Sequence, residues 1–395
     1  MIIQPKIRGF ICTTAHPVGC QQVVAEQVNY VQSKGQFNGP QNVLVIGAST
    51  GYGLASRIVS TFGAGAKTIG VFFEKEADEK RTASAGWYNT AAFEKMAHHE
   101  NYYATSINGD AFSREIKQKT AELIRKDLKK VDLIIYSLAS PRRTHPETGQ
   151  IYSSALKPVG QAFTNKTVDA FRGEVKAISL PPATADEISS TVAVMGGEDW
   201  EMWMDFLVNE NLLAEGVMTV AYSYIGPELT YSIYKNGTIG HAKDHLRLTA
   251  QKLDQKLKSL HGRAIISVNK AVVTQASAAI PVVPLYISLL FKVMKEEGTH
   301  ENCIEQIYRL FKDHLYSTHG LGCDEQGQVR IDDLEMRQDV QDKIAELWPQ
   351  INSENLAQLT DIMGYCNEFY RLFGFGASGV DYDADVNANV KIDSM

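Results

Sequence analysis

Short apolar runs alternate with amphipathic stretches through the first half of the chain. Each run is typical of a buried parallel strand. The runs are residues 42–49, 67–74, 101–111 and 131–141. Helices are predicted from about Gly51 and over 89–100 and 113–130. Strands and helices in alternation predict an α/β fold of the Rossmann type, with a doubly wound parallel sheet.

The middle of the chain departs from this pattern. Residues 153–184 combine turn residues, short β-like runs and a Pro-Pro pair, which predicts an excursion from the sheet. Residues 185–213 then predict two helices broken at Gly196 and Gly197. The strand pattern resumes over 216–226 and 263–273, and helices with loops are predicted from residue 301 onward.

We expect one enlarged dinucleotide-binding domain over residues 1–395, because no repeat, low-complexity run or obvious linker divides the chain. The composition, 44% hydrophobic and 22% charged, is that of a soluble globular protein. The expected parts are an N-terminal extension (1–40), a first nucleotide-binding half (41–140), a substrate-side insertion (141–215), a catalytic half (216–300) and a C-terminal helical extension (301–395).

Charge and cysteine usage narrow the class of protein and its compartment. A formal net charge of −7 argues against nucleic-acid binding, which needs a basic surface. The five cysteines are an odd number without a C-x-x-C pair, which is typical of a reducing, cytoplasmic setting and predicts neither disulfides nor a metal site. No signal peptide is predicted, because charge and proline interrupt the apolar residues at the start. Residues 278–294 are the longest apolar run, but two prolines and a lysine predict a buried core segment and no membrane span.

A glycine-rich turn follows the first predicted strand. Gly47, Gly51 and Gly53 have the spacing G-x-x-x-G-x-G and open a helix. Such a turn lets the backbone approach a pyrophosphate, and the helix N-terminus attracts the anion. The alternative is a glycine-rich turn that binds no ligand.

The end of the second predicted strand supports the nucleotide interpretation. Glu74 lies about twenty residues after Gly53, where a Rossmann-type fold places the acid that binds the adenosine ribose. A carboxylate there repels a 2′-phosphate, so NADH is expected over NADPH, although Lys75 could soften this exclusion. The alternative is that Glu74 only begins a solvated charge run. Further positions expected to flank the adenine and the nicotinamide ribose are Asp110, Ala111, Leu138 and Ala139.

Tyr234 and Lys243 are the candidate catalytic pair. Eight residues separate them, and Lys243 falls in the first turns of a helix predicted from about Thr238. A phenol has a pKa of about 10. A neighbouring ammonium group and a positive nicotinamide ring would make it a better acid. The chain has 17 tyrosines, so this spacing could also arise by chance.

At this point several motifs make the chain resemble the NADH-dependent trans-2-enoyl-CoA and enoyl-acyl-carrier-protein reductases, enlarged and usually monomeric relatives of the short-chain dehydrogenases. The motifs are "GASTGYGLASRI", "FFEK", "AGWYN", "IYSLASPRR", "AYSYIG", "IYKNGTIGHAK" and "TQASAAIPVVPLYISLLFKVMKEEG". With the opening "IIQPKIRGFIC" they cover nearly the whole chain. The eight-residue interval between tyrosine and lysine separates this group from ordinary short-chain dehydrogenases.

The resemblance implies a role for each matching residue. Tyr234 would donate the proton, Lys243 would hold the cofactor, and Tyr224 would touch the substrate. The residues implied to bind NADH are Gly47, Ala48, Ser49, Thr50, Gly51, Tyr52, Phe73, Glu74, Asp110, Ala111, Leu138, Ala139, Lys243, Val272, Val273 and Thr274.

The implied reaction is reduction of the C2–C3 double bond of an enoyl thioester, carried by coenzyme A or acyl carrier protein, in fatty-acid synthesis. NADH delivers hydride to C3, and Tyr234 binds the thioester oxygen as negative charge collects there. Tyr224 would add a second contact to this oxygen. Two other functions stay open: a short-chain carbonyl reductase using the same pair on a ketone, and a non-catalytic NADH-sensing protein.

Other features allow two interpretations each. Arg142 and Arg143 could meet coenzyme A phosphates or an acidic carrier protein, or lie in a solvated loop. His241 and His245 have metal-binding spacing, but an exposed helix face is favoured because no third ligand is nearby. The basic run over 117–130 is expected on the wet face of a helix. Residues 186–213 could supply an apolar wall for the acyl chain or form helix core, with Trp200, Met202, Trp203, Met204 and Phe206.

Overall fold

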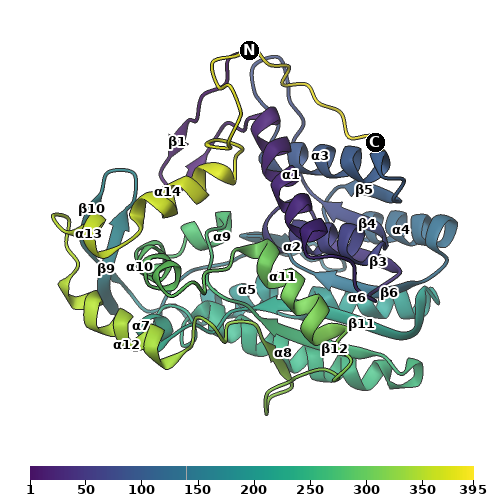
Figure 1. Cartoon of the computed structure of the whole chain (residues 1–395). Coiled ribbons are helices and arrows are strands. Elements are labelled where there is room, and N and C mark those ends of the chain that lie inside the picture. Colours follow the sequence, from purple (N-terminus) through teal and green to yellow (C-terminus); the bar gives the residue numbers. More distant parts are fainter. Residues whose placement is uncertain (139) are drawn as a thin grey trace.

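A parallel sheet of seven strands runs through the molecule in the order β13-β12-β11-β6-β3-β4-β5 (Figure 1). The computed structural model describes residues 1–138 and 140–395. The strands are β3 (Asn42–Ile46), β4 (Lys67–Phe72), β5 (Ala104–Asn108), β6 (Val131–Tyr136), β11 (Leu213–Ser223), β12 (Arg263–Val268) and β13 (Gln328–Arg330). All neighbours pair in parallel. The order reverses between β3 and β6, so the predicted doubly wound fold is confirmed.

Helices cover both faces of the sheet, because its strands are apolar on both sides. In β3, Val43 and Val45 join one core cluster, whereas Leu44 and Ile46 join another. All four side chains are fully buried. One face is covered by α1 (Pro17–Ser33), α2 (Gly51–Ile58), α3 (Ala85–His99) and α11 (Cys303–Arg309). The other is covered by α4 (Arg114–Leu123), α6 (Glu198–Asn209) and α8 (Thr238–Lys256).

The middle of the chain leaves the sheet as predicted. It forms two antiparallel hairpins and then a pair of helices, α5 (Ala185–Met195) and α6. The hairpins are β7 (Arg142–Thr144) with β8 (Ile151–Ser153), and β9 (Phe163–Asp169) with β10 (Glu174–Leu180). The helix break at Gly196 and Gly197 is confirmed. A β-carbon on Gly197 would lie 2.2 Å from Thr249 Oγ1, so this glycine allows close packing on α8.

The apolar run over 278–294 is buried core, as predicted. It forms most of α10 (Val283–Glu296), whose side chains pack with those of α12 (Gln338–Leu347) and α14 (Ile362–Arg371) in a third cluster. Within the described part of the chain, no helix is both long enough and apolar enough to cross a bilayer.

Two elements lie outside the sequence prediction. Helix α1 arises in the N-terminal extension, and β13 adds a strand where only helices and loops were expected. Strand β13 is three residues long, too short to show a period, and pairing with β12 places it in the sheet. The remaining elements are β1 (Ile7–Arg8), β2 (Ile11–Cys12), α7 (Glu228–Tyr231), α9 (Gln275–Ala278), α13 (Leu356–Leu359) and the short helical turns η1 (Val59–Gly63), η2 (Ile124–Leu128), η3 (Leu257–Leu260), η4 (Leu310–Leu315) and η5 (Trp348–Gln350).

Candidate active site

A cleft of about 1310 Å³ lies along the carboxyl ends of the sheet strands. This is where ligands bind in open α/β sheets. The predicted site residues that line it are Gly47, Ser49, Thr50, Gly51, Tyr52, Phe73, Glu74, Asp110, Ala111, Leu138, Tyr224, Tyr234, Lys243, Val272, Val273 and Thr274. Ala48 is fully buried under the turn, and Ala139 lies outside the described residues. The cleft therefore brings together residues that the chain separates by more than two hundred positions.

The glycine-rich turn is built so that only glycine fits at two positions. Gly47 has φ +90°, and a β-carbon there would lie 2.3 Å from the Ser137 carbonyl oxygen. A β-carbon on Gly53 would lie 1.8 Å from the Gly47 carbonyl oxygen. Helix α2 begins at Gly51, and Thr50 gives it no side-chain cap among the described residues. The amide groups at the start of α2 are thus directed toward an anion site.

Glu74 is fixed at the end of β4 and turned toward this glycine-rich turn. Ser49 Oγ donates a hydrogen bond to Glu74 Oε1 at 2.7 Å. Asn108 holds the backbone of Glu74 from β5, with contacts of 2.8 and 3.0 Å. Gly86 makes room for the carboxylate, since a β-carbon there would lie 2.1 Å from Glu74 Oε1. Phe73, 77% exposed, lies beside it in the cleft wall.

Tyr234 reaches the cleft from the turn between α7 and α8, and Lys243 reaches it from α8. The Tyr234 side chain is 8% exposed, and burial raises the pKa of its phenol. Lys243 Nζ donates to the Tyr222 carbonyl at 2.9 Å, and burial lowers the pKa of its ammonium group to about 8. Among the described residues no hydrogen bond engages the Tyr234 hydroxyl. This hydroxyl is thus a neutral donor at pH 7, on a residue that lines the cleft.

Tyr224 packs directly against Tyr234. The two ring centroids are 4.8 Å apart and the planes are nearly perpendicular, at 86°. The Tyr224 hydroxyl donates to Glu335 Oε1 at 2.8 Å. Glu335 was not predicted as a site residue, because its partners lie far away in sequence and no local motif marks it.

Lys270 is a second buried cation at the cleft that the sequence did not reveal. Its Nζ donates to the Ala271 carbonyl at 2.8 Å, and burial lowers its pKa to about 8. Its carbonyl accepts a hydrogen bond from the Tyr52 hydroxyl at 2.7 Å. The glycine-rich turn and the segment after β12 are therefore tied together.

Helix α6 belongs to the core, so the core interpretation holds for the five candidate side chains of residues 186–213, whereas Met195 of α5 in the same range lines the cleft. Trp200, Trp203 and Met204 are fully buried in the cluster beneath the sheet. None of the five candidate side chains lines the cleft. Apolar lining comes instead from Leu156, Met195, Ile239, Leu246, Ile280, Val283 and Ile287.

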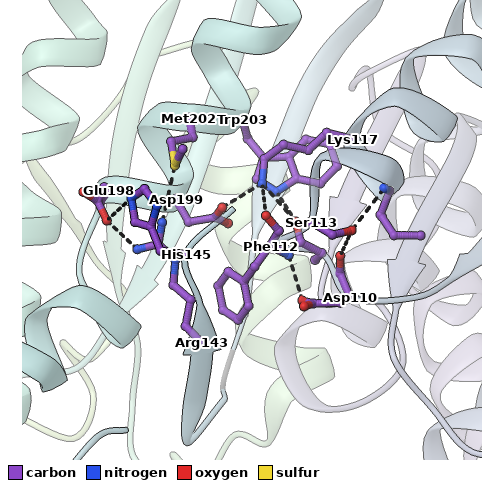
Figure 2. A network of polar contacts seen from close by, with 12 residues as sticks. Asp110, Phe112, Ser113, Lys117, Arg143, His145, Glu198, Asp199, Met202 and Trp203 are labelled. Carbon is purple, nitrogen blue, oxygen red and sulfur yellow. Dashed lines mark hydrogen bonds and ion pairs between the residues drawn. The ribbon is translucent and has the colours of Figure 1, made fainter. Parts of the chain in front are cut away.

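Lys117 departs from the wet face expected over 117–130, which the structure confirms for the exposed Lys119, Arg125, Lys126 and Lys129. Its side chain is buried, and Nζ donates to Asp199 Oδ1 at 2.8 Å and to the carbonyls of Ala111 and Phe112 at 3.1 Å (Figure 2). Trp203 Nε1 donates to the same Ala111 carbonyl at 3.1 Å. The prediction failed because α4 turns this lysine inward against α6, where a carboxylate meets it. The pair anchors the loop that carries Asp110 and Ala111.

Arg142 and Arg143 have different surroundings. Arg143 is 1% exposed and donates to the Ala193 carbonyl and to Glu198 Oε2, both at 2.6 Å (Figure 2). Arg142 is exposed and lines the cleft. Only Arg142 is therefore placed to meet a phosphate or an acidic partner.

His245, one of the two histidines with metal-binding spacing, accepts a hydrogen bond from Gly197 N through Nδ1 at 3.0 Å.

Three family models match consecutive parts of the chain. They are "NAD(P)H binding domain of trans-2-enoyl-CoA reductase" over residues 2–79, "Trans-2-enoyl-CoA reductase catalytic region" over 81–316, and "Enoyl reductase FAD binding domain" over 323–386.

Similar proteins carry related names. An "Enoyl-[acyl-carrier-protein] reductase [NADH]" of Flavobacterium johnsoniae is 62% identical, and a "Trans-2-enoyl-CoA reductase [NADH]" of Ruminiclostridium cellulolyticum is 58% identical, each over all of both chains. The crystal structure of Treponema denticola trans-2-enoyl-CoA reductase in complex with NAD is 50% identical. It covers 98% of both chains with a TM-score of 0.94. The structure of the Clostridium acetobutulicum enzyme with NADH is 43% identical, and it covers 99% of this chain and 100% of its own with a TM-score of 0.97.

Proposed function

This chain belongs to the trans-2-enoyl-CoA reductase family, and from that premise we infer that it reduces the C2–C3 double bond of trans-2-enoyl thioesters with NADH. The observation that carries this assignment to individual residues is the Tyr234 hydroxyl, which is buried and neutral, on a residue that lines the cleft. The same cleft carries Lys243 and the glycine-rich turn.

We propose that the glycine-rich turn and Glu74 hold NADH. Gly47, Thr50 and Gly51 line the cleft at the start of α2, where a pyrophosphate would meet free backbone amides, and Glu74 is turned toward this turn through its hydrogen bond from Ser49. Its carboxylate accepts hydrogen bonds from ribose hydroxyls and repels a 2′-phosphate. When bound, NADH supplies the hydride that the C3 atom of the substrate receives.

We propose that Tyr234 hydrogen-bonds the thioester oxygen and stabilises the negative charge that develops there. Since burial raises the pKa of Tyr234, the phenol keeps its proton at physiological pH and remains a donor. A donor aimed at charge that appears only in the transition state raises kcat more than it tightens substrate binding. Lys243 approaches from the first turns of α8, and we assign it to the ribose hydroxyls of the nicotinamide end.

The family model for residues 323–386 is named for FAD binding, but the residues present do not fit a second dinucleotide. This segment, all of which is described, packs its apolar side chains against α10. It contributes Glu368, Arg371, Leu372 and Phe373 to the cleft. The strand, glycine turn and helix that cradle a pyrophosphate lie at β3 and α2, outside this segment. We derive no step through a flavin.

We further propose that Arg142 meets the phosphates of coenzyme A or an acidic surface of acyl carrier protein, since it is exposed at the cleft. The apolar residues of α10 and its neighbours would hold the acyl chain. We expect one enlarged domain acting as a monomer in the cytoplasm, in fatty-acid synthesis. The five free cysteines and the names of the relatives support this setting.

The test is NADH oxidation by the purified protein with crotonyl-CoA, compared with NADPH and with the Tyr234→Phe variant. We expect turnover with NADH, a preference over NADPH, and a loss of about 10²- to 10³-fold in kcat for the variant, as for other oxyanion donors. NADH binding by the variant should be unchanged.

Two outcomes would favour the other functions. Reduction of simple ketones without turnover of crotonyl-CoA would indicate a carbonyl reductase. Tight NADH binding with no turnover of either substrate would indicate a sensor.

A further inference from the structure

Glu335 is a buried carboxylate behind the wall of the cleft, and the proposed reaction does not use it. Its side chain is 0% exposed. Its oxygens accept three hydrogen bonds, from the Tyr224 hydroxyl at 2.8 Å, the Tyr286 hydroxyl at 2.6 Å and Ala271 N at 2.7 Å. A carboxylate is stable out of water only with such a set of donors.

The C-terminal extension positions Glu335 behind the wall of the cleft. Strand β13 pairs beside β12, and the amides of Ile331 and Asp332 both donate to the Val268 carbonyl, at 2.8 and 3.1 Å. The loop that follows therefore starts at the carboxyl end of β12. From α12, Gln341 Nε2 donates to the Glu335 carbonyl at 2.7 Å. Hydrogen bonds thus hold the backbone both just before Glu335, at Ile331 and Asp332, and at the Glu335 carbonyl itself.

In this hydrogen-bond network Glu335 is the acceptor, and its three partners are the donors. Burial raises the pKa of Glu335 above its ordinary value, although the Lys270 ammonium group and the three donors act in the opposite direction. Burial and the nearby carboxylate raise the pKa values of Tyr224 and Tyr286, so both phenols stay protonated and donate. A phenol has one proton, and that of Tyr224 is engaged by Glu335.

Two parts of the cleft wall depend on this one carboxylate. The Tyr224 ring, held through its hydroxyl, packs against the Tyr234 ring at 4.8 Å. Ala271, held through its amide, immediately precedes Val272, which also lines the cleft. A shift of Glu335 would therefore move the proposed proton donor and the proposed nicotinamide wall together.

Resting on the proposed function, we propose that Glu335 is a positioning residue that holds Tyr224 against Tyr234 and thereby aligns the thioester with the nicotinamide. Because the Tyr224 hydroxyl donates its hydrogen bond to Glu335, Tyr234 is the phenol of this pair that donates to the thioester oxygen. The second contact to that oxygen expected from Tyr224 on resemblance is replaced by a contact through its ring.

A double-mutant cycle tests the proposal, using crotonyl-CoA turnover with Glu335→Gln, Tyr224→Phe and the double variant. Both phenols bond Oε1 and Ala271 N bonds Oε2, so in Glu335→Gln the donating end of the amide loses either the Ala271 contact or both phenol contacts. We expect each single variant to lose about ten- to a hundredfold in kcat, because small misplacements of reacting groups are costly. The KM for NADH should change less than about twofold in Tyr224→Phe, which leaves the contact between Ala271 N and Glu335 in place. The double variant should be no worse than the more impaired single variant, because both substitutions act on the same network.

Tyr286→Phe is the matched control, since it removes a phenol from the same carboxylate on the side of α10. Its kcat should stay within about twofold of wild type. Wild-type kcat in Glu335→Gln would overturn the proposal, and so would fully additive losses in the double variant. If Glu335→Gln fails to bind NADH and so reports only misfolding, Tyr224→Phe decides alone, and wild-type kcat there would overturn it. Absence of turnover in the wild-type protein would overturn the proposed function and this inference with it.

Discussion

Lys243 combines a charged role with a half-buried position at the cleft, and this gives the active site a pH dependence. Burial lowers the pKa of its ammonium group to about 8, so the folded protein releases this proton well before a solvated lysine does. Below pH 8 the cation is present and can donate to ribose hydroxyls. Above pH 8 it is progressively lost.

We therefore expect kcat/KM for NADH to fall as the pH rises through about 8, approaching about tenfold per pH unit. Tyr234 does not contribute to this limb, because burial raises its pKa. Initial rates between pH 6 and 10 would measure the profile. In Lys243→Arg the guanidinium group stays charged, so the fall should disappear. An unchanged fall in that variant would assign the transition to another group, such as Lys270.

The sequence predicted the residues of the glycine-rich turn and Glu74, but it did not predict the buried residues that hold the walls of the cleft in place. Gly47, Gly53 and Glu74 follow strand ends, so a local pattern reveals them. Lys117 and Glu335 depend on partners that the fold supplies: Asp199 lies 82 positions from Lys117, and Ala271 lies 64 from Glu335. A single sequence carries no sign of such pairings, and a lysine on an amphipathic helix is more often solvated.

The loop between β5 and α4 lines the cleft, and a lysine of helix α4, which covers one face of the sheet, holds this loop in place. The Lys117 ammonium group binds two carbonyls of this loop and Asp199 of α6 (Figure 2). Burial lowers the pKa of Lys117 and raises that of Asp199, and each is countered by the other's charge. The pair thus holds loop, α4 and α6 in one arrangement.

Lys117→Met should lower the free energy of unfolding by about 3–5 kcal/mol, because Asp199 is left as an uncompensated buried charge. The KM for NADH should also rise, since Asp110 and Ala111 lose their anchor. Urea unfolding and initial rates measure the two effects. Lys119→Met, on the exposed side of the same helix, should change stability by less than about 0.5 kcal/mol. Equal stability of the two variants would show that the buried pair contributes nothing.

Sequence periodicity predicted the long strands of the sheet, but it missed helix α1 and the short strand β13. Strands such as β3 and β6 have apolar runs that only a sheet buried on both faces explains. Strand β13 has the sequence Gln-Val-Arg, and it is a strand because it pairs with the edge of β12. This pairing is a tertiary contact, so no local sequence pattern could predict it.

Over the whole molecule, the last residues of the chain return to the first nucleotide-binding half. Ile392 is 1% exposed, and Ser394 donates through N and Oγ to the buried Glu94 carboxylate at 3.1 and 2.9 Å. Glu94 also accepts from Ser106 and lies 3.6 Å from the buried Arg57 of α2. The terminal segment thus reaches the polar core beneath the glycine-rich turn.

Ile392→Ala should lower the free energy of unfolding by about 2–5 kcal/mol, the range for removing a fully buried aliphatic side chain. The neighbouring Lys391 is exposed, so Lys391→Ala serves as the control and should have little effect. Chemical denaturation measures both. If the two variants unfold alike, the terminal segment does not contribute to the stability of the fold.

The position of Glu335 in the chain has a consequence for biosynthesis. The ribosome completes the glycine-rich turn early, and it adds Glu335 about 280 residues later. At ordinary elongation rates this is a delay of roughly 15 to 55 s. During this interval the glycine-rich turn, Tyr224 and Ala271 are already made but still lack the carboxylate that holds the two latter residues. Catalytic competence is therefore gained only near the end of translation.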